Sequence, residues 1–222
     1  MAPNTDTDSQ ALARRAAKIA TSTFANALDD FGLAGQILPT LKQVAPRLSC
    51  AGPAVTVRES VGEAGTYESK DFRVGAMIDA AGTGDVIVVE ACGANISTWG
   101  GMASFAARHK GVAGLLCDGG VRDLEEIVGF EFPVFARHLT PTTGRTRLKV
   151  EAIGEPVTVD GVRVEPGDMV VADGTGVVIL PVDRAAEIIS VAEGFAADDA
   201  AAIEDLAKGL NFSEAMAKYT RI

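Results

Sequence analysis

The residues best suited to chemistry lie between Trp99 and Glu126, in the segment WGGMASFAARHKGVAGLLCDGGVRDLEE. Arg122 and Asp123 place a guanidinium beside a carboxylate one residue after a glycine pair, and Asp118 supplies a second carboxylate nearby. We expect the Arg-Asp pair where a strand ends and a helix begins, a place where backbone N–H groups point outward. Such a place suits a small anionic ligand together with a divalent cation, which prefers oxygen ligands.

The Arg-Asp pair also has a purely structural interpretation. Asp123 and Glu126 have the D-x-x-E spacing of a capping box, in which Asp123 would only cap a helix and Arg122 would be a surface cation. Three features favour the functional interpretation. The pair follows a strand and a Gly-Gly turn, a further carboxylate stands at the end of that strand, and Gly100-Gly101 forms another glycine-lined patch at the start of the preceding helix.

Hydrophobic periodicity places these residues in a mixed α/β framework. Apolar runs predict strands at 48–57, 85–90, 112–117 and 132–135, followed by several short antiparallel strands between 148 and 180. Helical periodicity predicts helices over 9–33 with a break near 21–23, over 71–81, 97–110 and 123–129, over 183–208 with a break at Gly194, and over 213–219. Residues 59–68 are expected to form a loop, and residues 118–120 a turn.

The whole chain has the composition of one compact domain. We expect a single domain over 1–222, with a loose polar leader at 1–8 and a helical C-terminal tail at 183–222. The net charge of −10 disfavours a nucleic-acid partner. No run approaches the roughly 20 apolar residues of a membrane span, and the N-terminus lacks the apolar region of a secretory signal. We therefore expect a cytoplasmic protein without membrane or nucleic-acid partners.

Other candidate groups give weaker signals. Cys50, Cys92 and Cys117 lack zinc spacing and fit reduced, buried thiols. His109 is expected to be a solvated residue at a helix end, whereas His138 follows a strand and is a weak candidate for a pocket. The Gly-Thr-Gly motifs at 82–84 and 174–176 precede strands, so they predict turns rather than nucleotide-binding loops.

An ordered set of residues resembles the RraA-like family, which includes the 4-hydroxy-4-methyl-2-oxoglutarate aldolases. The family pattern is W-G-[DE]-L-x-A-x-x-A-x-x-x-G-x-x-G followed by x-D-G-x-x-R-D. The segments 51–58, 133–145 and 167–181 resemble flanking strands of the family, and the similarity covers roughly residues 20–190. The matching positions are Trp99, Gly100, Ala103, Ala106, Gly111, Gly114, Asp118, Gly119, Arg122 and Asp123.

The resemblance implies an α/β fold of the swivelling β/β/α sandwich type with a mixed sheet. It also implies a homo-oligomer, either a trimer or a hexamer built as a dimer of trimers, with active sites between subunits. A divalent metal, Mg²⁺ or Mn²⁺, would be held by Asp123 and waters, with Asp118 and Glu126 as possible outer groups. Arg122 would contact the 2-oxo oxygen of a substrate whose carboxylate is held by backbone amides around Met102 and Ala103, in a subsite that includes Gly100 and Gly101.

The implied activity is that of a metal-dependent carbon–carbon lyase acting on a small 2-oxo acid. Aldol cleavage of 4-hydroxy-4-methyl-2-oxoglutarate and decarboxylation of oxaloacetate both pass through the enolate of pyruvate. A hard cation and the fixed charge of Arg122 would stabilise that enolate. One alternative is a non-catalytic regulator, because the family's namesake binds and inhibits ribonuclease E. Another is a lyase of the same fold with a different keto acid.

The chain departs from the aldolase pattern at one position. Aldolase members carry an acidic residue 21 positions before the Arg, and here Gly101 stands at that position. Glu126 lies one helical turn beyond Asp123 and could supply the missing carboxylate, directly or through water. The alternative is that Glu126 serves only in a helix cap. The regulator hypothesis accommodates Gly101 more simply, because a binding protein does not need that acid.

Overall fold

A mixed sheet of ten strands forms the centre of the computed structural model, which describes residues 5–219. Its middle strands run parallel in the order β3, β4, β6 and β7. Buried apolar side chains fill these strands, as expected for parallel strands covered on both faces. The short β5 runs parallel to the end of β6. The bounds are β3 Cys50–Val61, β4 Val86–Glu90, β5 Ser97–Trp99, β6 Gly114–Val121 and β7 Val134–Leu139.

Antiparallel strands extend the sheet on both sides. On one side β11, β12 and β1 follow β3 in that order, and on the other β2 follows β7. β8 pairs with the far half of β3, while β9 and β10 form a separate hairpin. The bounds are β1 Ile37–Leu38, β2 Lys42–Gln43, β8 Leu148–Ile153, β9 Val157–Val159, β10 Val162–Val164, β11 Met169–Ala172 and β12 Val177–Leu180.

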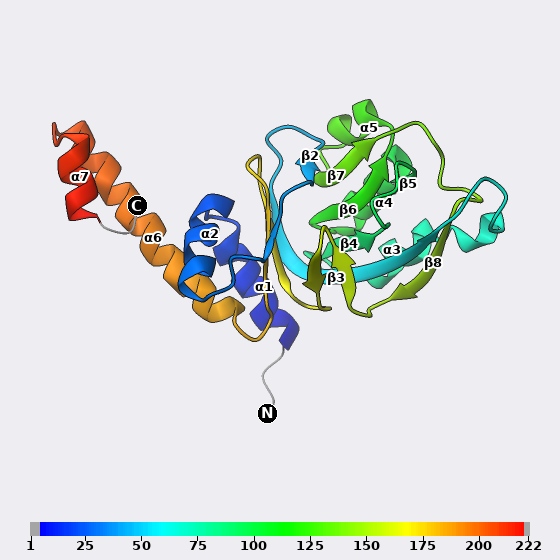
Figure 1. Cartoon of the computed structure of the whole chain (residues 1–222), viewed down its shortest axis with the longest axis horizontal. Helices are drawn as coiled ribbons and strands as arrows, with labels where there is room; N and C mark the ends of the chain where they lie inside the picture. The colour runs from blue at the N-terminus through cyan, green and yellow to red at the C-terminus, as the bar shows by residue number, and fades with distance from the viewer. Residues whose placement is uncertain (1–4, 220–222) are drawn as a thin grey trace.

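Two groups of helices cover different parts of the sheet (Figure 1). Helices α3, α4 and α5 pack on the parallel strands around Trp99 and Phe132, whose rings stack. Helices α1, α2 and α6 pack on β11 and β12 around Phe24 and Phe195. The bounds are α1 Thr5–Ala16, α2 Thr21–Asp30, α3 Val74–Ala80, α4 Gly101–Lys110, α5 Leu124–Gly129, α6 Ala185–Ala207 and α7 Phe212–Lys218, with a short 3-10 helix η1 at Ser69–Asp71.

The long strand β3 joins the parallel and antiparallel parts of the sheet. Its first residues pair with β11, and its last residues pair with β8. The register with β8 shifts between Arg58 and Glu59, which marks a bulge. As a result Glu59 is buried beyond the end of β4.

Several predicted boundaries near the centre of the sequence are wrong. The predicted loop over 59–68 begins too early, because β3 continues to Val61. The predicted helix over 97–110 begins with a strand, since Ser97–Trp99 pairs with β6. The predicted turn at 118–120 belongs to β6, which runs through both glycines to Val121. A register shift between Cys117 and Gly120 accommodates these residues in the strand.

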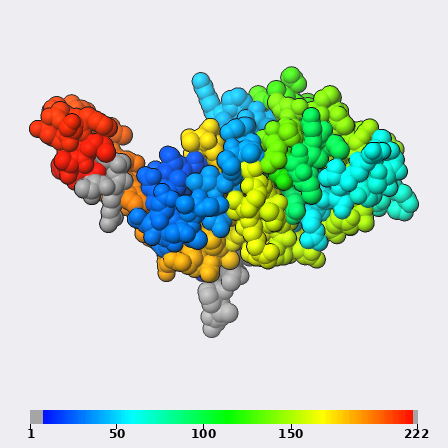
Figure 2. All heavy atoms as spheres, in the orientation of Figure 1, coloured from blue at the N-terminus to red at the C-terminus, as the bar shows by residue number. Residues whose placement is uncertain are grey.

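The two ends of the chain also differ from the prediction. Residues 5–8 of the expected loose leader begin α1, and its residues 1–4 lie outside the described part. The break in the N-terminal helical region falls at residues 17–20, just before the predicted position. The tail is helical as predicted, but α6 passes Gly194 without a break. Figure 2 shows α6 and α7 projecting from the body of the molecule, and exposed apolar side chains of this arm include Ile203, Phe212 and Met216.

The cysteines follow the expectation only in part. Cys50 and Cys117 are buried, and burial raises the pKa of the Cys50 thiol to about 12. Cys92 is exposed and has a left-handed backbone conformation with φ 53°. Among the described residues, no helix is long and apolar enough to cross a membrane.

Candidate active site

A pocket of about 340 Å³ lies at the N-terminal end of α4. One wall carries Gly100, Met102, Ala103, Arg122 and Asp123, so five of the residues predicted from the sequence meet here. Another part of the wall is mostly apolar and comes from α3 and from Phe72, which follows η1. The remaining lining residues are Phe72, Val74, Gly75, Ile78, Ser97, Thr98, Trp99, Ala106 and Thr143.

Asp123 has an unusual backbone conformation for a residue other than glycine. It stands at the N-cap of α5 with φ 62° and ψ 47°, in the left-handed region. Its side chain makes no cap hydrogen bond to α5, so the capping box allowed by the D-x-x-E spacing does not form. Instead, Asp123 Oδ2 accepts a hydrogen bond of 3.2 Å from the backbone N–H of Gly101. The carboxylate therefore lies across the N-terminus of α4, where a negative charge is stabilised.

The position of Arg122 next to Asp123 is fixed at the end of β6. Its backbone N–H donates to the carbonyl of Trp99 at 3.0 Å, which fixes the point where the chain leaves β6. Its side-chain Nε lies 3.4 Å from Asp123 Oδ2, and the guanidinium is half exposed. The free face of the guanidinium is thus available to a second anion in the pocket.

The first turn of α4 offers backbone donors to the pocket. Gly100 is the N-cap and has no side chain to accept from the helix. Gly101 N–H binds Asp123, and Ser104 N–H donates to Gly100 O, the first hydrogen bond within the helix. The amides of Met102 and Ala103 have no partner within the helix because they belong to its first turn. Two N–H groups at a helix N-terminus suit a carboxylate.

Gly101 itself lies against Glu126. It is buried and does not line the cavity. A Cβ at Gly101 would overlap the carboxylate of Glu126 and lie 2.5 Å from the Glu126 Cβ. A Cβ at Gly100 would lie 2.5 Å from Asp123 Oδ2. The two glycines therefore leave room for the two carboxylates of α5, and the Glu126 carboxylate occupies the space that a side chain at position 101 would need.

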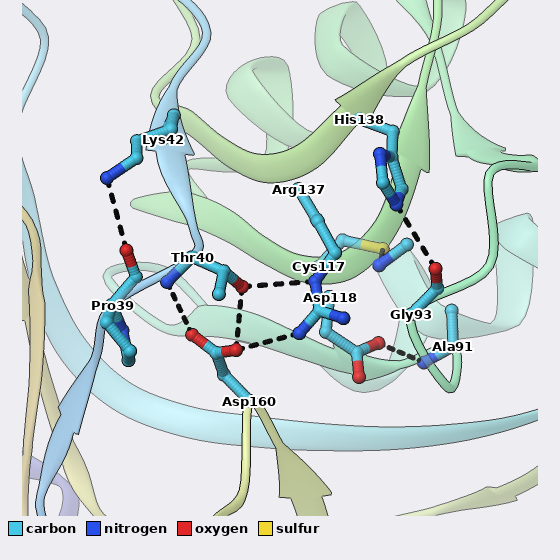
Figure 3. A network of polar contacts seen from close by, with 11 residues as sticks. Pro39, Thr40, Lys42, Ala91, Gly93, Cys117, Asp118, Arg137, His138 and Asp160 are labelled. Carbon is cyan, nitrogen blue, oxygen red and sulfur yellow. Dashed lines mark hydrogen bonds and ion pairs between the residues drawn. The ribbon is translucent and has the colours of Figure 1, made fainter.

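Asp118 lies outside this pocket. It is buried, and its Oδ1 accepts a 2.6 Å hydrogen bond from the backbone N–H of Ala91 (Figure 3). Burial raises the pKa of Asp118, against the lowering effect of hydrogen bonds from the amides of Ala91 and Gly93. Its position at the pocket was expected from a turn at 118–120, and the continuous strand β6 removes that geometry.

A second polar cluster lies on the hairpin side of the sheet (Figure 3). The Asp160 carboxylate accepts from Thr40 N–H and Oγ1, both at 2.6 Å, and from Arg137 Nη2 at 2.7 Å. His138 Nε2 lies 3.1 Å from the carbonyl of Gly93 rather than in the pocket. These contacts tie the β9–β10 hairpin and the loop after β4 to β7, and none of these residues lines the pocket.

The residues present fit a divalent cation of the magnesium type. Within residues 5–219, no group of three or more His, Cys, Asp or Glu could hold a metal. Magnesium needs few protein ligands, since it retains several waters and binds one or two carboxylates together with its substrate. Both contacts of the Asp123 carboxylate use Oδ2, so Oδ1 is left for a cation. A single-carboxylate site on Asp123, completed by waters and an anionic substrate, is compatible with this geometry.

The sequence did not indicate several residues of the pocket. Phe72 and Thr143 come from distant loops, and only the folded chain brings them to α4. Thr98 also lines the pocket, but the sequence predicted it to be part of a helix over 97–110. Its Oγ1 donates a 2.6 Å hydrogen bond to Oε1 of Glu59, which was predicted to be part of a loop over 59–68. One feature of the sequence could have indicated that Glu59 belongs to the strand. It is a single acidic residue near the end of the alternating apolar pattern of β3.

Comparison with known proteins finds relatives by sequence. The chain is 38% identical over 143 residues to an uncharacterised protein of Methanocaldococcus jannaschii, covering 64% of this chain and 65% of that protein. It is 31% identical over 156 residues to a 4-hydroxy-4-methyl-2-oxoglutarate aldolase of Thermus thermophilus, covering 69% and 90%. The chain spans 65% and 27% of the first two curated relatives that it matches.

A solved structure supports the fold expected from the sequence. Streptomyces coelicolor RraAS2, described as an unusual member of the RNase ES inhibitor RraA protein family, aligns with a TM-score of 0.73 at 27% identity, over 90% of this chain and 96% of that one. The predicted mixed α/β domain is thereby confirmed. The family model "RraA-like: Aldolase/RraA" matches residues 21–179. This match covers most of the chain, which therefore belongs to the RraA-like family.

Proposed function

We propose that this chain is a divalent-metal-dependent lyase that cleaves a carbon–carbon bond of a small 2-oxo acid and releases pyruvate. The observation that carries the proposal is the convergence of Arg122, Asp123 and the amides of Met102 and Ala103 on one pocket. An aldolase among the relatives supports a lyase at the level of the family. The candidate substrates are 4-hydroxy-4-methyl-2-oxoglutarate, oxaloacetate and related keto acids.

In the proposed mechanism the protein binds the carboxylate and the adjacent 2-oxo group of the substrate. The amides of Met102 and Ala103 hold the carboxylate at the N-terminus of α4, and Arg122 donates to the 2-oxo oxygen. Breaking the C3–C4 bond leaves an enolate, so negative charge grows on the oxygen that faces Arg122. A fixed guanidinium stabilises this charge without reorganisation, which is the usual source of electrostatic catalysis.

Asp123 and Glu126 supply the carboxylates of the proposed site. Asp123 would hold a divalent cation, which would supply Lewis-acid stabilisation of the oxyanion. The hydrogen bond from Gly101 N–H orients the Asp123 carboxylate and leaves Oδ1 free. Glu126 takes the space above Gly101 and, in this proposal, provides the acidic group that other aldolases carry on the α4 side. Asp118 acts indirectly, by holding the loop after β4 through Ala91.

We further propose that the working form is a cytoplasmic homo-oligomer. Met102 and Phe105 are 84% and 56% exposed beside the pocket on α4. Exposed apolar side chains of this size favour burial against another subunit. A trimer or a dimer of trimers would place a second chain at the mouth of the pocket.

The experiment that tests the function is a coupled assay of pyruvate release. Each candidate substrate is offered with Mg²⁺, with Mn²⁺ and with EDTA, against a metal-only blank. We expect metal-dependent release that EDTA abolishes. The variant Asp123→Asn retains the side-chain shape and tolerates the left-handed backbone, so it is expected to stay folded while turnover falls at least ~100-fold.

The alternative function is that of a protein regulator. It is favoured by the likeness to RraAS2, which is described in terms of ribonuclease inhibition. Absence of pyruvate release from every candidate keto acid, in a protein shown to be folded, would contradict the lyase proposal. A regulator would bind its partner equally well in EDTA and in the Asp123→Asn variant.

A further inference from the structure

Glu59 is a buried acid that the mechanism above does not use, and it lies behind Thr98, a residue that lines the candidate active site. Its residue is 2% exposed, and it sits directly after the bulge in β3. Oε1 accepts the 2.6 Å hydrogen bond from Thr98 Oγ1. Within the described part of the chain, Oε2 is buried and has no hydrogen-bond partner. An unpaired buried carboxylate oxygen is costly, so this carboxylate takes up a proton more readily than an exposed glutamate does.

Thr98 connects this acid to the pocket. It lies in β5, between Ser97 and Trp99, and all three residues line the cavity. A donor–acceptor distance of 2.6 Å is typical of a hydroxyl bound to an ionised carboxyl group. A hydroxyl can accept one proton while it donates another, so Thr98 is able to pass a proton between a ligand and Glu59.

We propose that Glu59 exchanges protons with the bound substrate through the hydroxyl of Thr98. This inference rests on the proposed lyase function and adds the group that accepts and returns a proton during the reaction. Cleavage of an aldol removes a proton from the 4-hydroxyl group, and formation of pyruvate adds a proton at C3. One group that first takes and then returns a proton serves both steps.

Each proton that leaves the substrate is taken up by a group of the site, and no electrons are gained or lost. As the C3–C4 bond breaks, its electron pair forms the enolate, and the 4-hydroxyl proton passes to Thr98 Oγ1. The proton that Thr98 carried moves along the hydrogen bond to Glu59 Oε1. The return transfer delivers a proton to C3, which regenerates the Glu59 carboxylate. Glu59 acts through Thr98 and is a positioning, proton-holding residue rather than a group that touches the substrate.

The charged surroundings favour this role. Burial raises the pKa of Glu59 to about 7, the hydrogen bond from Thr98 opposes the rise, and the charge of Asp118 on β6 adds to it. Cys117 on β6 and Cys92 after β4 also lie within electrostatic reach. On β8, Lys149 and Glu151 flank the partner of Glu59 and pair with each other at the surface.

The charged groups on the strands β7 and β4 beside Glu59 are engaged with other partners. Arg137 on β7 lowers the pKa of Asp118 and of Cys117, and it is paired with Asp160. Glu90 on β4 accepts from the backbone N–H of Thr158, on the β9 hairpin. A carboxyl group with a pKa near neutrality is suited to general acid and base catalysis at the pH of a cell.

The test follows exchange of the pyruvate methyl protons with D₂O by proton NMR, with Mg²⁺ present. This exchange is the enolate half of the reaction and needs no second product. In the unmodified protein we expect the rate to rise with pH through an apparent pKa near 7. Glu59→Gln and Thr98→Val are expected to slow the exchange at least ~100-fold, and to remove the pH dependence.

Two further variants separate a proton relay from a structural role. Thr98→Ser keeps the hydroxyl and should retain most of the exchange and its pH profile. Asp168→Asn changes another buried acid with a raised pKa, directly before β11, and should leave the exchange unchanged. Folding of every variant is checked by its unfolding midpoint in urea.

The outcomes distinguish the two proposals. Exchange in Glu59→Gln at the rate and with the pH profile of the unmodified protein would overturn the relay alone. A Thr98→Ser variant as slow as Thr98→Val would do the same, because the hydroxyl would then be irrelevant. No metal-dependent exchange in the unmodified, folded protein would overturn the lyase proposal, and with it the relay.

Discussion

At the scale of single residues, the candidate site depends on a carboxylate that leaves its own helix. An N-cap aspartate ordinarily binds the amides of the helix that it starts. Asp123 instead crosses to α4, and its left-handed backbone directs the side chain there. Such conformations cost on the order of 1–3 kcal/mol and persist where surrounding contacts maintain them, often at functional sites. The D-x-x-E spacing could not reveal this, because a capping box has the same sequence.

The glycine at position 101 gives the first prediction at this scale. Gly101→Asp would force a side chain into the space of Glu126, and we expect overpacking to cost about 1–3 kcal/mol of stability without a gain in turnover. The double variant Gly101→Asp/Glu126→Gly removes the clash and moves the acid from α5 to α4. It should recover turnover above that of Gly101→Asp and of Glu126→Gly. Urea unfolding and pyruvate release are the measurements, and higher turnover of a fully stable Gly101→Asp protein would contradict the prediction.

The buried Glu59 predicts a pH dependence of stability. Its pKa is about 7 in the folded chain against an ordinary value of 4.5, so the folded state holds a proton that the unfolded state has lost. Stability should therefore fall as pH rises from about 4.5 to 7, by an amount on the order of 3 kcal/mol from this group. Glu59→Gln should flatten this part of the curve. The free energy of unfolding in urea is measured across this pH range for the unmodified protein and for Glu59→Gln. The same dependence on pH in both proteins would refute the prediction.

At the scale of secondary-structure elements, the sequence predicts most of the framework. The prediction places the parallel strands β4 and β6 and the helices α4 and α5 near their observed positions. It does so because runs of apolar residues mark the strands and apolar residues at helical spacing mark the helices. The strand at 97–99 was missed because Ser97, Thr98 and Trp99 continue a helical pattern, and only pairing with β6 makes them extended. The bulge that buries Glu59 likewise depends on a partner, β8, that lies ninety residues away.

The Asp160 carboxylate links the hairpin of β9 and β10 to Thr40 and Arg137. Burial works to raise the pKa of Asp160, but hydrogen bonds from Thr40 and the charge of Arg137 outweigh it and lower the pKa. A group with a lowered pKa stabilises the fold above its ordinary pKa and loses that effect as pH falls through the folded value.

We therefore predict a strong effect of removing Asp160. Asp160→Ala removes three hydrogen bonds and leaves Arg137 without its partner, at a cost of about 2–4 kcal/mol. Asp160→Asn retains part of the hydrogen bonding and the left-handed backbone, so its loss should be smaller. Urea unfolding at neutral pH gives both values, and equal losses would show that the charge and its hydrogen bonds are unimportant. The pocket lies on another part of the sheet, so the substrate KM should not change.

At the scale of the whole molecule, the exposed apolar surface of α4 and α5 predicts self-association. Phe105 stacks with His109 and meets Phe130 edge-on, yet it remains 56% exposed. Phe105→Glu should shift the protein to a smaller species in size-exclusion chromatography with light scattering, with little change in the unfolding of the monomer. Turnover should fall in parallel if a second chain closes the pocket. An unchanged molar mass would indicate that this surface is not the interface.

The two walls of the pocket come from separate parts of the chain, and this division has an evolutionary consequence. The charged wall is built by the start of α4 and by the link between β6 and α5, whereas the apolar wall is built by Phe72, Val74 and Ile78. A change in the apolar segment can alter which side group of a keto acid is accepted, without disturbing Arg122 or Asp123. Replacement of residues 62–78 between relatives is accordingly a route to exchange substrate selectivity while Arg122 and Asp123, and the bond cleavage that depends on them, are kept.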